Sequence, residues 1–346
     1  MDRGEALRLL ALDPLEVTET EEYQAGFFEP SDSQGVARLF YAVYGDGYPI
    51  DTYYIPERLA EENRLGNIRS VVARTASGLV VSHVACHRSS PANPNLYEMG
   101  VGLTLPAYRS SRAFSVVAQL VMELAGTDGV DGFYGEAVCN HTITQKMFRQ
   151  YQTLETALEP ALMPAEAYRA VEGGAGRVGC VVHSRVARDC SRPLYVPSAY
   201  REQLAFILDG LGLDRELLVG GASPSGGGAR IDVQRFDAAG VARCTVAAPG
   251  EDLAARLREL EQGELPDNCA LVQFFVDLGQ PWSGAVVEQL RGSGYCLGGL
   301  LPIWFGSDAL LMQRHFVDPG FDGMNIYSER GRALLEMVRG DWRRCR

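Results

Sequence analysis

Hydrophobic residues recur at helical spacing between residues 33 and 44, and Gly45 and Gly47 end the pattern. This spacing predicts a helix that finishes at Tyr44, with Ser31 and Gln34 placed as a capping box at its start. Three runs rich in β-forming residues follow, at residues 68–73, 79–87 and 96–103. The pattern therefore predicts one helix and then three strands of a single sheet.

The same two periodicities continue to about residue 190. An apolar helical face predicts a helix from Phe114 to about Gly126, and residues 144–151 form a shorter helical segment. Apolar runs at residues 132–139 and 178–186 predict two more strands. Strands and helices that alternate in this way are typical of an α/β fold, here α+β in character, with a mixed sheet flanked by helices.

The second half of the chain repeats this order of elements. Pro193 and Pro197 indicate a linker, and the glycine- and serine-rich stretch 220–229 reads as a flexible loop. Beyond it the expected order is again strand, strand, helix, strand, helix, strand: 231–236, 241–247, 253–260, 270–278, 283–290 and two final strands. The halves share little identity, so the repeat is one of architecture. We expect two domains, 1–190 and 191–346, each long enough to bury a core.

Composition and charge narrow the class of protein. The 346 residues are 46% hydrophobic and 22% charged, as in ordinary globular proteins, and no run of about 18 apolar residues predicts a membrane span. The formal net charge of −12 disfavours nucleic acid and acidic membranes as partners. A cationic or amine-bearing partner is easier to bind, although acidity also simply keeps a protein in solution. Acidic residues within residues 1–17 disfavour a signal peptide, so we expect a cytoplasmic protein.

The cysteine pattern gives no sign of a metal site. Eight cysteines are scattered without a C-x-x-C pair, which is typical of small buried hydrophobes in a reducing compartment. His83 and His87, with Cys86 and Cys139, lie on neighbouring predicted strands. Residues 83 and 87 of one strand are nevertheless too far apart to share an ion without further ligands. We therefore expect no metal.

Residues 95–118, NLYEMGVGLTLPAYRSSRAFSVVA, form the most informative stretch. An apolar strand runs through Pro106 into a polar Arg-Ser-Ser-Arg loop and then into an amphipathic helix. Such a loop presents backbone N–H groups and a positive helix end to an anion such as pyrophosphate. The stretch resembles the acyl-CoA loop of the GCN5-related N-acetyltransferases (GNAT), whose pattern is Arg or Gln, two residues, Gly, one residue, Gly or Ala. Arg109 matches the first position, whereas Arg112 and Phe114 stand at the two small-residue positions.

The resemblance covers residues 35–186 in element order and implies a tandem pair of GNAT-like domains, the second a degenerate copy at residues 230–316. It implies acetyl-CoA or another acyl-CoA as co-substrate, held by the end of the strand and by the loop. The residues implied are Leu103, Thr104, Leu105, Arg109, Ser110, Ser111, Arg112, Ala113 and Phe114. The matching loop of the second copy, residues 247–252, is acidic and would repel a pyrophosphate.

The resemblance also implies roles for residues around this loop. Glu98 is the first candidate for the catalytic base and Glu136 on the next strand is the second, because a carboxylate whose pKa is raised by burial suits a base near neutrality. His141 is a third candidate, with a loop-capping residue as its alternative role. In the family, one wall of the site for the acceptor substrate comes from the first two helices and their connection, so Tyr48, Tyr53 and Tyr54 would line that wall. The alternative is that these tyrosines only cover the sheet.

Two family features are replaced in the first domain. Phe148 stands where the family has a proton-donating tyrosine, with Tyr151 one turn later, and Gln152 replaces the closing glycine. Two functions therefore remain open. The first is an acyl-CoA-dependent N-acyltransferase, most simply an acetyltransferase, that acts on a small-molecule amine or amino-acid-like metabolite. The second is a GNAT-like module that has lost acetyl transfer and binds a ligand or a partner. A homodimer is left open in either case.

Overall fold

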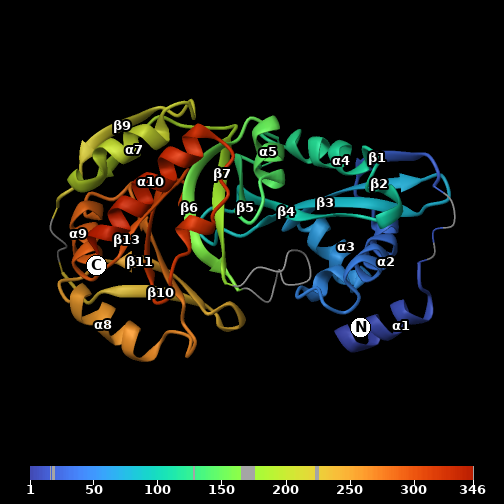
Figure 1. Ribbon diagram of the computed structural model, residues 1–346, viewed down its shortest axis with the longest axis horizontal. Coiled ribbons are helices and arrows are strands. Elements are labelled where there is room, and N and C mark those ends of the chain that lie inside the picture. Colours follow the sequence, from blue (N-terminus) through green and yellow to red (C-terminus); the bar gives the residue numbers. More distant parts are fainter. Residues whose placement is uncertain (16, 18–19, 128, 165–175, 223–225, 346) are drawn as a thin grey trace. The chain divides into compact units, whose positions relative to one another are not determined.

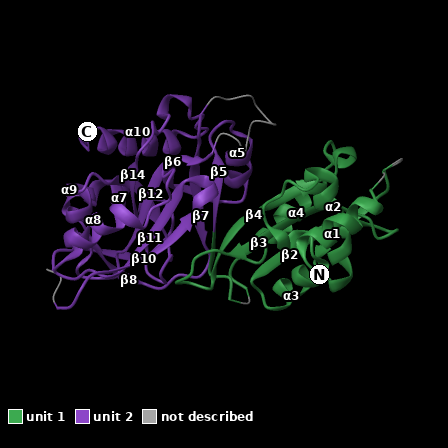
Figure 2. Cartoon of the chain, turned by 90° about the horizontal axis from the view of Figure 1, so that it is seen from below, with its two compact units in different colours: residues 1–133 green, residues 134–346 purple. Residues whose placement is uncertain are grey.

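A computed structural model describes residues 1–15, 17, 20–127, 129–164, 176–222 and 226–345. The chain divides into two compact units, residues 1–133 and 134–346, shown in green and purple in Figure 2. The domain boundary expected at residue 190 concerns the two repeats and stays a prediction. Residues 223–225 of the expected flexible loop lie outside the described residues.

Unit 1 contains a four-stranded antiparallel arrangement in the order β1-β2-β3-β4. Its elements are α1 (Arg3–Leu12), β1 (Tyr23–Phe27), η1 (Pro30–Asp32), α2 (Ser33–Tyr44), η2 (Asp51–Tyr53), α3 (Pro56–Arg64), β2 (Ile68–Thr75), β3 (Val80–Arg88), β4 (Leu96–Thr104), η3 (Pro106–Tyr108) and α4 (Ala113–Met122). Helices α2 and α3 cover one face of these strands and α4 covers the other (Figure 1). The core of unit 1 lies between these layers, so β2 and β3 are buried along most of their length.

Unit 2 contains strands in the order β5-β7-β6-β13-β14-β12-β11-β10 and a small parallel pair, β8 and β9. Its elements are β5 (Gly132–Val138), α5 (Ile143–Gln150), β6 (Leu154–Met163), β7 (Val178–Val186), β8 (Arg192–Val196), η5 (Ser198–Tyr200), α7 (Arg201–Leu208), β9 (Arg215–Val219), β10 (Arg230–Phe236), η6 (Asp237–Ala239), β11 (Val241–Ala248), α8 (Leu253–Gly263), β12 (Leu271–Asp277), α9 (Ser283–Gly292), β13 (Cys296–Leu301), β14 (Ala309–His315), η7 (Phe321–Gly323) and α10 (Glu329–Arg344). Figure 1 shows α10 running across β13 and β6, against which it packs.

The repeat of architecture predicted from the sequence is visible within unit 2. In the sheet, β7 lies between β5 and β6, and β14 lies between β12 and β13, so the last strand is inserted between its two predecessors both times. The strands β5, β7 and β6 join the strands β13, β14 and β12 where β6 and β13 pair antiparallel, with Ala157 opposite Gly299. Gly299 has φ +137°, and a Cβ there would overlap the backbone of residue 157. Only glycine allows so close a junction.

Most of the expected elements are present, and the mixed α/β fold with helices flanking mixed sheets is confirmed. The helix to Tyr44 and the strand over residues 178–186 have the expected bounds. The expected capping box is wrong, because Glu29 and Asp32 form the box around η1 instead of Ser31 and Gln34. The expected linker is also wrong in part, because Pro193 lies within β8, which pairs with β9.

Candidate active site

A bulge in β4 shapes the strand that leads into the arginine loop. The pairing of β3 with β4 shifts register between His83 and Ala85, and Val101 in the bulge has φ +54°. That left-handed conformation is strained for a β-branched residue, at a cost of about 1 to 3 kcal/mol. His83 offsets this strain because its Nδ1–H donates to the Val101 carbonyl oxygen at 3.1 Å, while its Nε2 accepts from the Ser70 hydroxyl at 3.1 Å. Burial lowers the pKa of His83 to about 4, so the ring is neutral.

A cavity of about 340 Å³ lies at the end of the bulged strand. It is lined by Val43, Tyr44, Gly102, Leu103, Thr104, Arg109 and Phe114. Four of the residues expected to hold acyl-CoA thus line one cavity together. The Phe114 ring packs directly on β4, since a Cβ on Gly102 would lie 2.7 Å from Phe114 Cε2. The ring therefore narrows the approach to the strand backbone that a glycine or alanine would leave open.

The arginine loop is exposed and partly closed by its own hydrogen bonds. The Ser111 hydroxyl donates to the Tyr108 carbonyl oxygen at 2.7 Å and accepts from the Ala113 N–H at 3.1 Å, which caps the start of α4. Arg109, Ser110, Ser111 and Arg112 are all exposed, whereas Ala113 and Leu105 are buried. An anion here would have to use the amides of Ser110, Arg112 and Phe114 together with the two guanidinium groups.

Glu98 lies on β4, directly opposite His87 on β3. The Glu98 carboxylate and His87 Nε2 are 3.4 Å apart, and the two side chains are 21% and 27% exposed. Burial raises the pKa of Tyr48, and Tyr44 and Glu98 raise it further, so the Glu98 charge acts on the tyrosine-rich wall of unit 1. Glu98 thus stands near a group that can exchange a proton with it, and it remains accessible to solvent.

The three predicted wall tyrosines have unequal positions. Tyr53 and Tyr54 are buried at 2% and 0% exposure; Tyr53 stacks on Phe40 and the Tyr54 hydroxyl donates to the Gly45 carbonyl oxygen. Tyr48 is half-buried, and its ring lies 5.1 Å from that of Tyr44. Tyr44 is the tyrosine that lines the cavity. No pattern in the sequence selects Tyr44, because it is predicted as the last residue of a helix.

Glu136, the second base candidate, belongs to a half-buried ionic cluster in unit 2. Its carboxylate accepts from Arg243 Nη2 at 2.7 Å, and the same nitrogen lies 3.4 Å from Glu159. Gln273 completes the cluster by accepting from Arg243 Nε and donating to Glu159. Burial opposes the charge of Arg243, but Glu136 and Glu159 outweigh it and hold its pKa above the ordinary value. A carboxylate paired in this way is a poor proton acceptor, so the cluster fits a structural role.

The other features of unit 2 resemble the family only in outline. His141 Nδ1 accepts from the Ile143 N–H at 3.3 Å at the start of α5, which is the capping role weighed above. Phe148 stacks on buried His183, with ring centroids 5.2 Å apart. Gln152 has φ +59°, so it adopts the left-handed conformation that a glycine would hold without strain. Tyr151 is half-buried, and burial raises its pKa.

The matching loop of the second copy is filled by the chain itself. Gly250 has φ +51°, and a Cβ there would overlap Ala229. The Ala229 N–H donates to the Asp252 carboxylate at 2.5 Å, and Asp252 is the N-cap of α8. A carboxylate already stands where a phosphate would have to bind.

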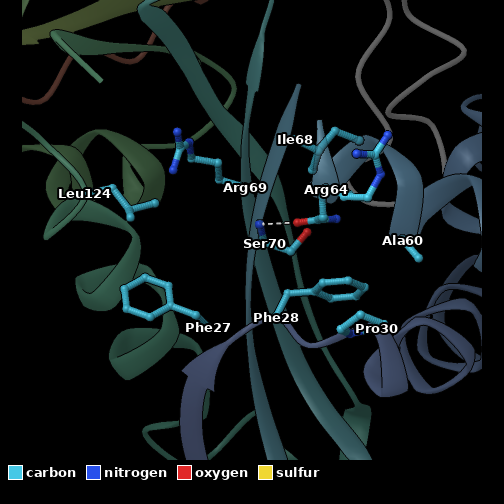
Figure 3. A pocket seen from close by; sticks show the side chains of 10 residues that line it. Phe27, Phe28, Pro30, Ala60, Arg64, Ile68, Arg69, Ser70 and Leu124 are labelled. Carbon is cyan, nitrogen blue, oxygen red and sulfur yellow. Dashed lines mark hydrogen bonds between the residues drawn. The ribbon is translucent and has the colours of Figure 1, made fainter. Parts of the chain in front are cut away.

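A second cavity of unit 1, of about 420 Å³, lies away from the residues predicted to act. Figure 3 shows Phe27, Phe28 and Pro30 on one side of Ser70, with Arg64 and Arg69 beyond it. The Ser70 N–H donates to the Asn63 side-chain oxygen at 2.9 Å, drawn as a dashed line in Figure 3. Apolar side chains supply most of this lining.

Two further kinds of feature, a metal-ligand cluster and a membrane-spanning helix, were sought among the described residues. No three His, Cys, Asp or Glu side chains among the described residues are placed to hold a metal ion. Across the same residues, none of the helices combines the length and apolar character needed to cross a membrane.

Similarity to known proteins was found at the level of solved structures. No family model and no curated protein matches this sequence. Among solved structures, a ribosomal-protein-S5-alanine acetyltransferase from Vibrio fischeri matches at 12% identity over 50% of this chain and 98% of its own, with a TM-score of 0.38. An acetyltransferase of the GNAT family from Streptococcus pneumoniae matches at 11% identity over 48% and 99%, with a TM-score of 0.40. The structure of yncA from Salmonella typhimurium, solved with its cofactor acetyl-CoA, matches at 12% identity over 50% and 98%, with a TM-score of 0.39.

Each of these matches covers about half of this chain. At this identity and TM-score they assign neither an activity nor a residue role to this protein.

Proposed function

We propose that this protein is an acyl-CoA-dependent N-acyltransferase, most simply an acetyltransferase, whose acceptor is the amine of a small metabolite or amino-acid-like molecule. One observation carries the proposal: Leu103, Thr104, Arg109 and Phe114, chosen from the sequence as acyl-CoA contacts, line a single cavity beside a bulged strand. Acyl-CoA supplies the activated acyl thioester when it is bound.

The charge of the arginine loop in unit 1 suits the phosphates of acyl-CoA, whereas the space in the cavity is reduced by one side chain. The guanidinium groups of Arg109 and Arg112 and the start of α4 favour an anion such as a phosphate. Leu103 and Thr104, at the end of β4, line the same cavity. The Phe114 ring reduces the room beside Gly102.

Glu98 is assigned as the base. Transfer to an amine requires removal of a proton from the ammonium group, so that the nitrogen lone pair can attack the acyl carbon. The Glu98 carboxylate accepts that proton, and His87 at 3.4 Å provides the next site for it. The leaving thiolate also requires a proton; Tyr44, which lines the cavity, is the nearest phenol to offer one.

Calorimetry with CoA and acetyl-CoA tests the proposal directly. Replacing Arg109 and Arg112 with glutamine should weaken binding by about 1 to 3 kcal/mol per lost contact, since each is a charge-assisted hydrogen bond. Arg8→Gln, at an exposed position on α1, is the matched control. Absence of binding at millimolar CoA would overturn the proposal.

The second candidate is a GNAT-like module that binds a ligand or partner without acetyl transfer. Phe114 against Gly102, together with Phe148 in place of the tyrosine, favours it. Thiol release from acetyl-CoA across a panel of small amines separates the two, because only the enzyme turns over.

A further inference from the structure

Two cysteines of unit 2, far apart in the sequence, meet at the end of the last helix. Cys296 is the first residue of β13 and Cys345 directly follows α10, and the two thiols lie close enough to influence each other's ionisation. The Cys345 thiol also donates to the Tyr295 carbonyl oxygen at 3.4 Å, and the Cys296 thiol donates to that of Gln313 at 3.2 Å. Both sulfur atoms therefore lie at the same end of β13, where the strand begins.

The two thiols differ in access and in acidity. Cys296 is 1% exposed, whereas Cys345 is half-buried and open to a small oxidant. The interaction with the neighbouring Cys296 thiol lowers the pKa of Cys345 to about 7 despite its burial, with Arg344 and Arg291 favouring the thiolate. Asp341 and the carboxyl end of α10 oppose it. The same contact and burial raise the pKa of Cys296, so Cys345 is the thiol that ionises first.

We propose that Cys296 and Cys345 are a redox site, which a peroxide converts into an intrachain disulfide that ties the end of α10 to β13. The Cys345 thiolate attacks one peroxide oxygen, the O–O bond breaks, and a sulfenic acid forms with loss of water. The Cys296 sulfur then attacks the Cys345 sulfur while its proton passes to the leaving hydroxide; the S–O bond breaks, the S–S bond forms and a second water leaves. Two thiols are oxidised and one hydrogen peroxide is reduced to two waters.

The other cysteines provide internal references. Burial raises the pKa of Cys86, Cys139 and Cys244 to about 12, so these thiols are neutral and shielded at pH 7. Cys190 is exposed and reports what access alone allows. The expected selectivity is thus for one pair among eight cysteines.

Peroxide treatment of the full chain, followed by alkylation and peptide mass spectrometry, tests the proposal. We expect a linked pair of peptides carrying residues 296 and 345, reversed by dithiothreitol. The melting temperature should rise by about 5 to 10 °C, because the crosslink closes a long loop. Cys345→Ser should abolish both effects, and Cys190→Ser should abolish neither.

The measurement on the unaltered protein stands even where a variant folds poorly. Recovery of Cys296 and Cys345 in alkylated form after peroxide treatment would overturn the proposal. So would conversion of Cys345 to sulfinic acid without a linked peptide, or disulfides that involve only Cys190.

Discussion

The ring of Phe114 packs on Gly102, so closely that a Cβ at Gly102 would lie 2.7 Å from Phe114 Cε2. The ring occupies space beside the bulged strand, within the cavity proposed for acyl-CoA. Phe114→Ala should therefore open the approach to the β4 backbone and strengthen acyl-CoA binding by about 1 kcal/mol, which is several-fold. Calorimetry measures the change, and Phe27→Ala, at an exposed ring outside this cavity, is the control. Weaker binding in Phe114→Ala would mean that the ring is itself a contact for the ligand.

The two base candidates should respond differently to the same substitution. Glu98→Gln keeps the size of the side chain but removes the proton acceptor, so kcat should fall about 100-fold with little change in CoA affinity. Glu136→Gln removes one charged partner of half-buried Arg243 and should cost about 1 to 3 kcal/mol of folding free energy. The activity per folded molecule should stay near that of the unaltered protein. If Glu136→Gln lost activity but kept its full stability, Glu136 would be the catalytic base and not a structural partner of Arg243.

The sequence pattern predicted a strand or helix correctly where the residues of that element alone show the apolar spacing. Residues 178–186 begin with an apolar, β-rich run, VGCVV, and match β7 at both ends. Strand β6 was missed because its sequence, LETALEPALM, carries two glutamates and a proline. Both glutamates are buried and paired with arginines, Glu155 with Arg149 and Glu159 with Arg243. Those partners are unknown until the chain is folded.

The same distinction applies to the site. Four of the residues that line the cavity could be predicted because Leu103 to Phe114 lie in one segment of the sequence, whereas Tyr44 comes from a distant helix. His83 was weighed only as a metal ligand, because its bond to Val101 depends on the bulge. Arg243 was not selected at all, since its partner Glu136 comes from a distant segment. A lone arginine on an apolar strand was the available signal.

Stability should fall with acid between pH 6.5 and 4. Burial lowers the pKa of His83 and His183 to about 4 from their ordinary 6.5, so the unfolded chain binds more protons in that window. Stability from these groups is therefore fully present above pH 6.5 and is lost as the pH falls to about 4, by about 3 kcal/mol for His83. Urea unfolding at a series of pH values measures the slope. Glutamine cannot titrate in this range, so His83→Gln should reduce the slope of unfolding free energy against pH and leave the part that His183 contributes. An unchanged slope would contradict the role assigned to His83.

One equivalent of CoA should bind per chain. The loop of the second copy is closed by Ala229 and carries the Asp252 carboxylate at the start of α8, which repels a phosphate. Asp252→Asn should leave the stoichiometry at one, because Ala229 still fills the loop. Titration calorimetry gives the number directly. Two equivalents of similar affinity would show that the second copy is a site in its own right.

The junction of β6 with β13 should be among the least tolerant positions of unit 2. Gly299 has φ +137°, a conformation almost restricted to glycine, and a Cβ there would overlap the backbone of Ala157 on the neighbouring strand. Gly299→Ala should therefore cost about 3 kcal/mol or more, because neither strand can move without breaking its pairing.

Gly340 offers the opposite case, since it lies in α10 with open space around its Cα. Gly340→Ala should stabilise the protein by about 0.5 to 1 kcal/mol through helix propensity. Chemical unfolding of both variants measures the contrast. If Gly299→Ala unfolded at the same denaturant concentration as the unaltered chain, β6 and β13 would not pair at this position. The sheets of the two repeats would then have to join elsewhere.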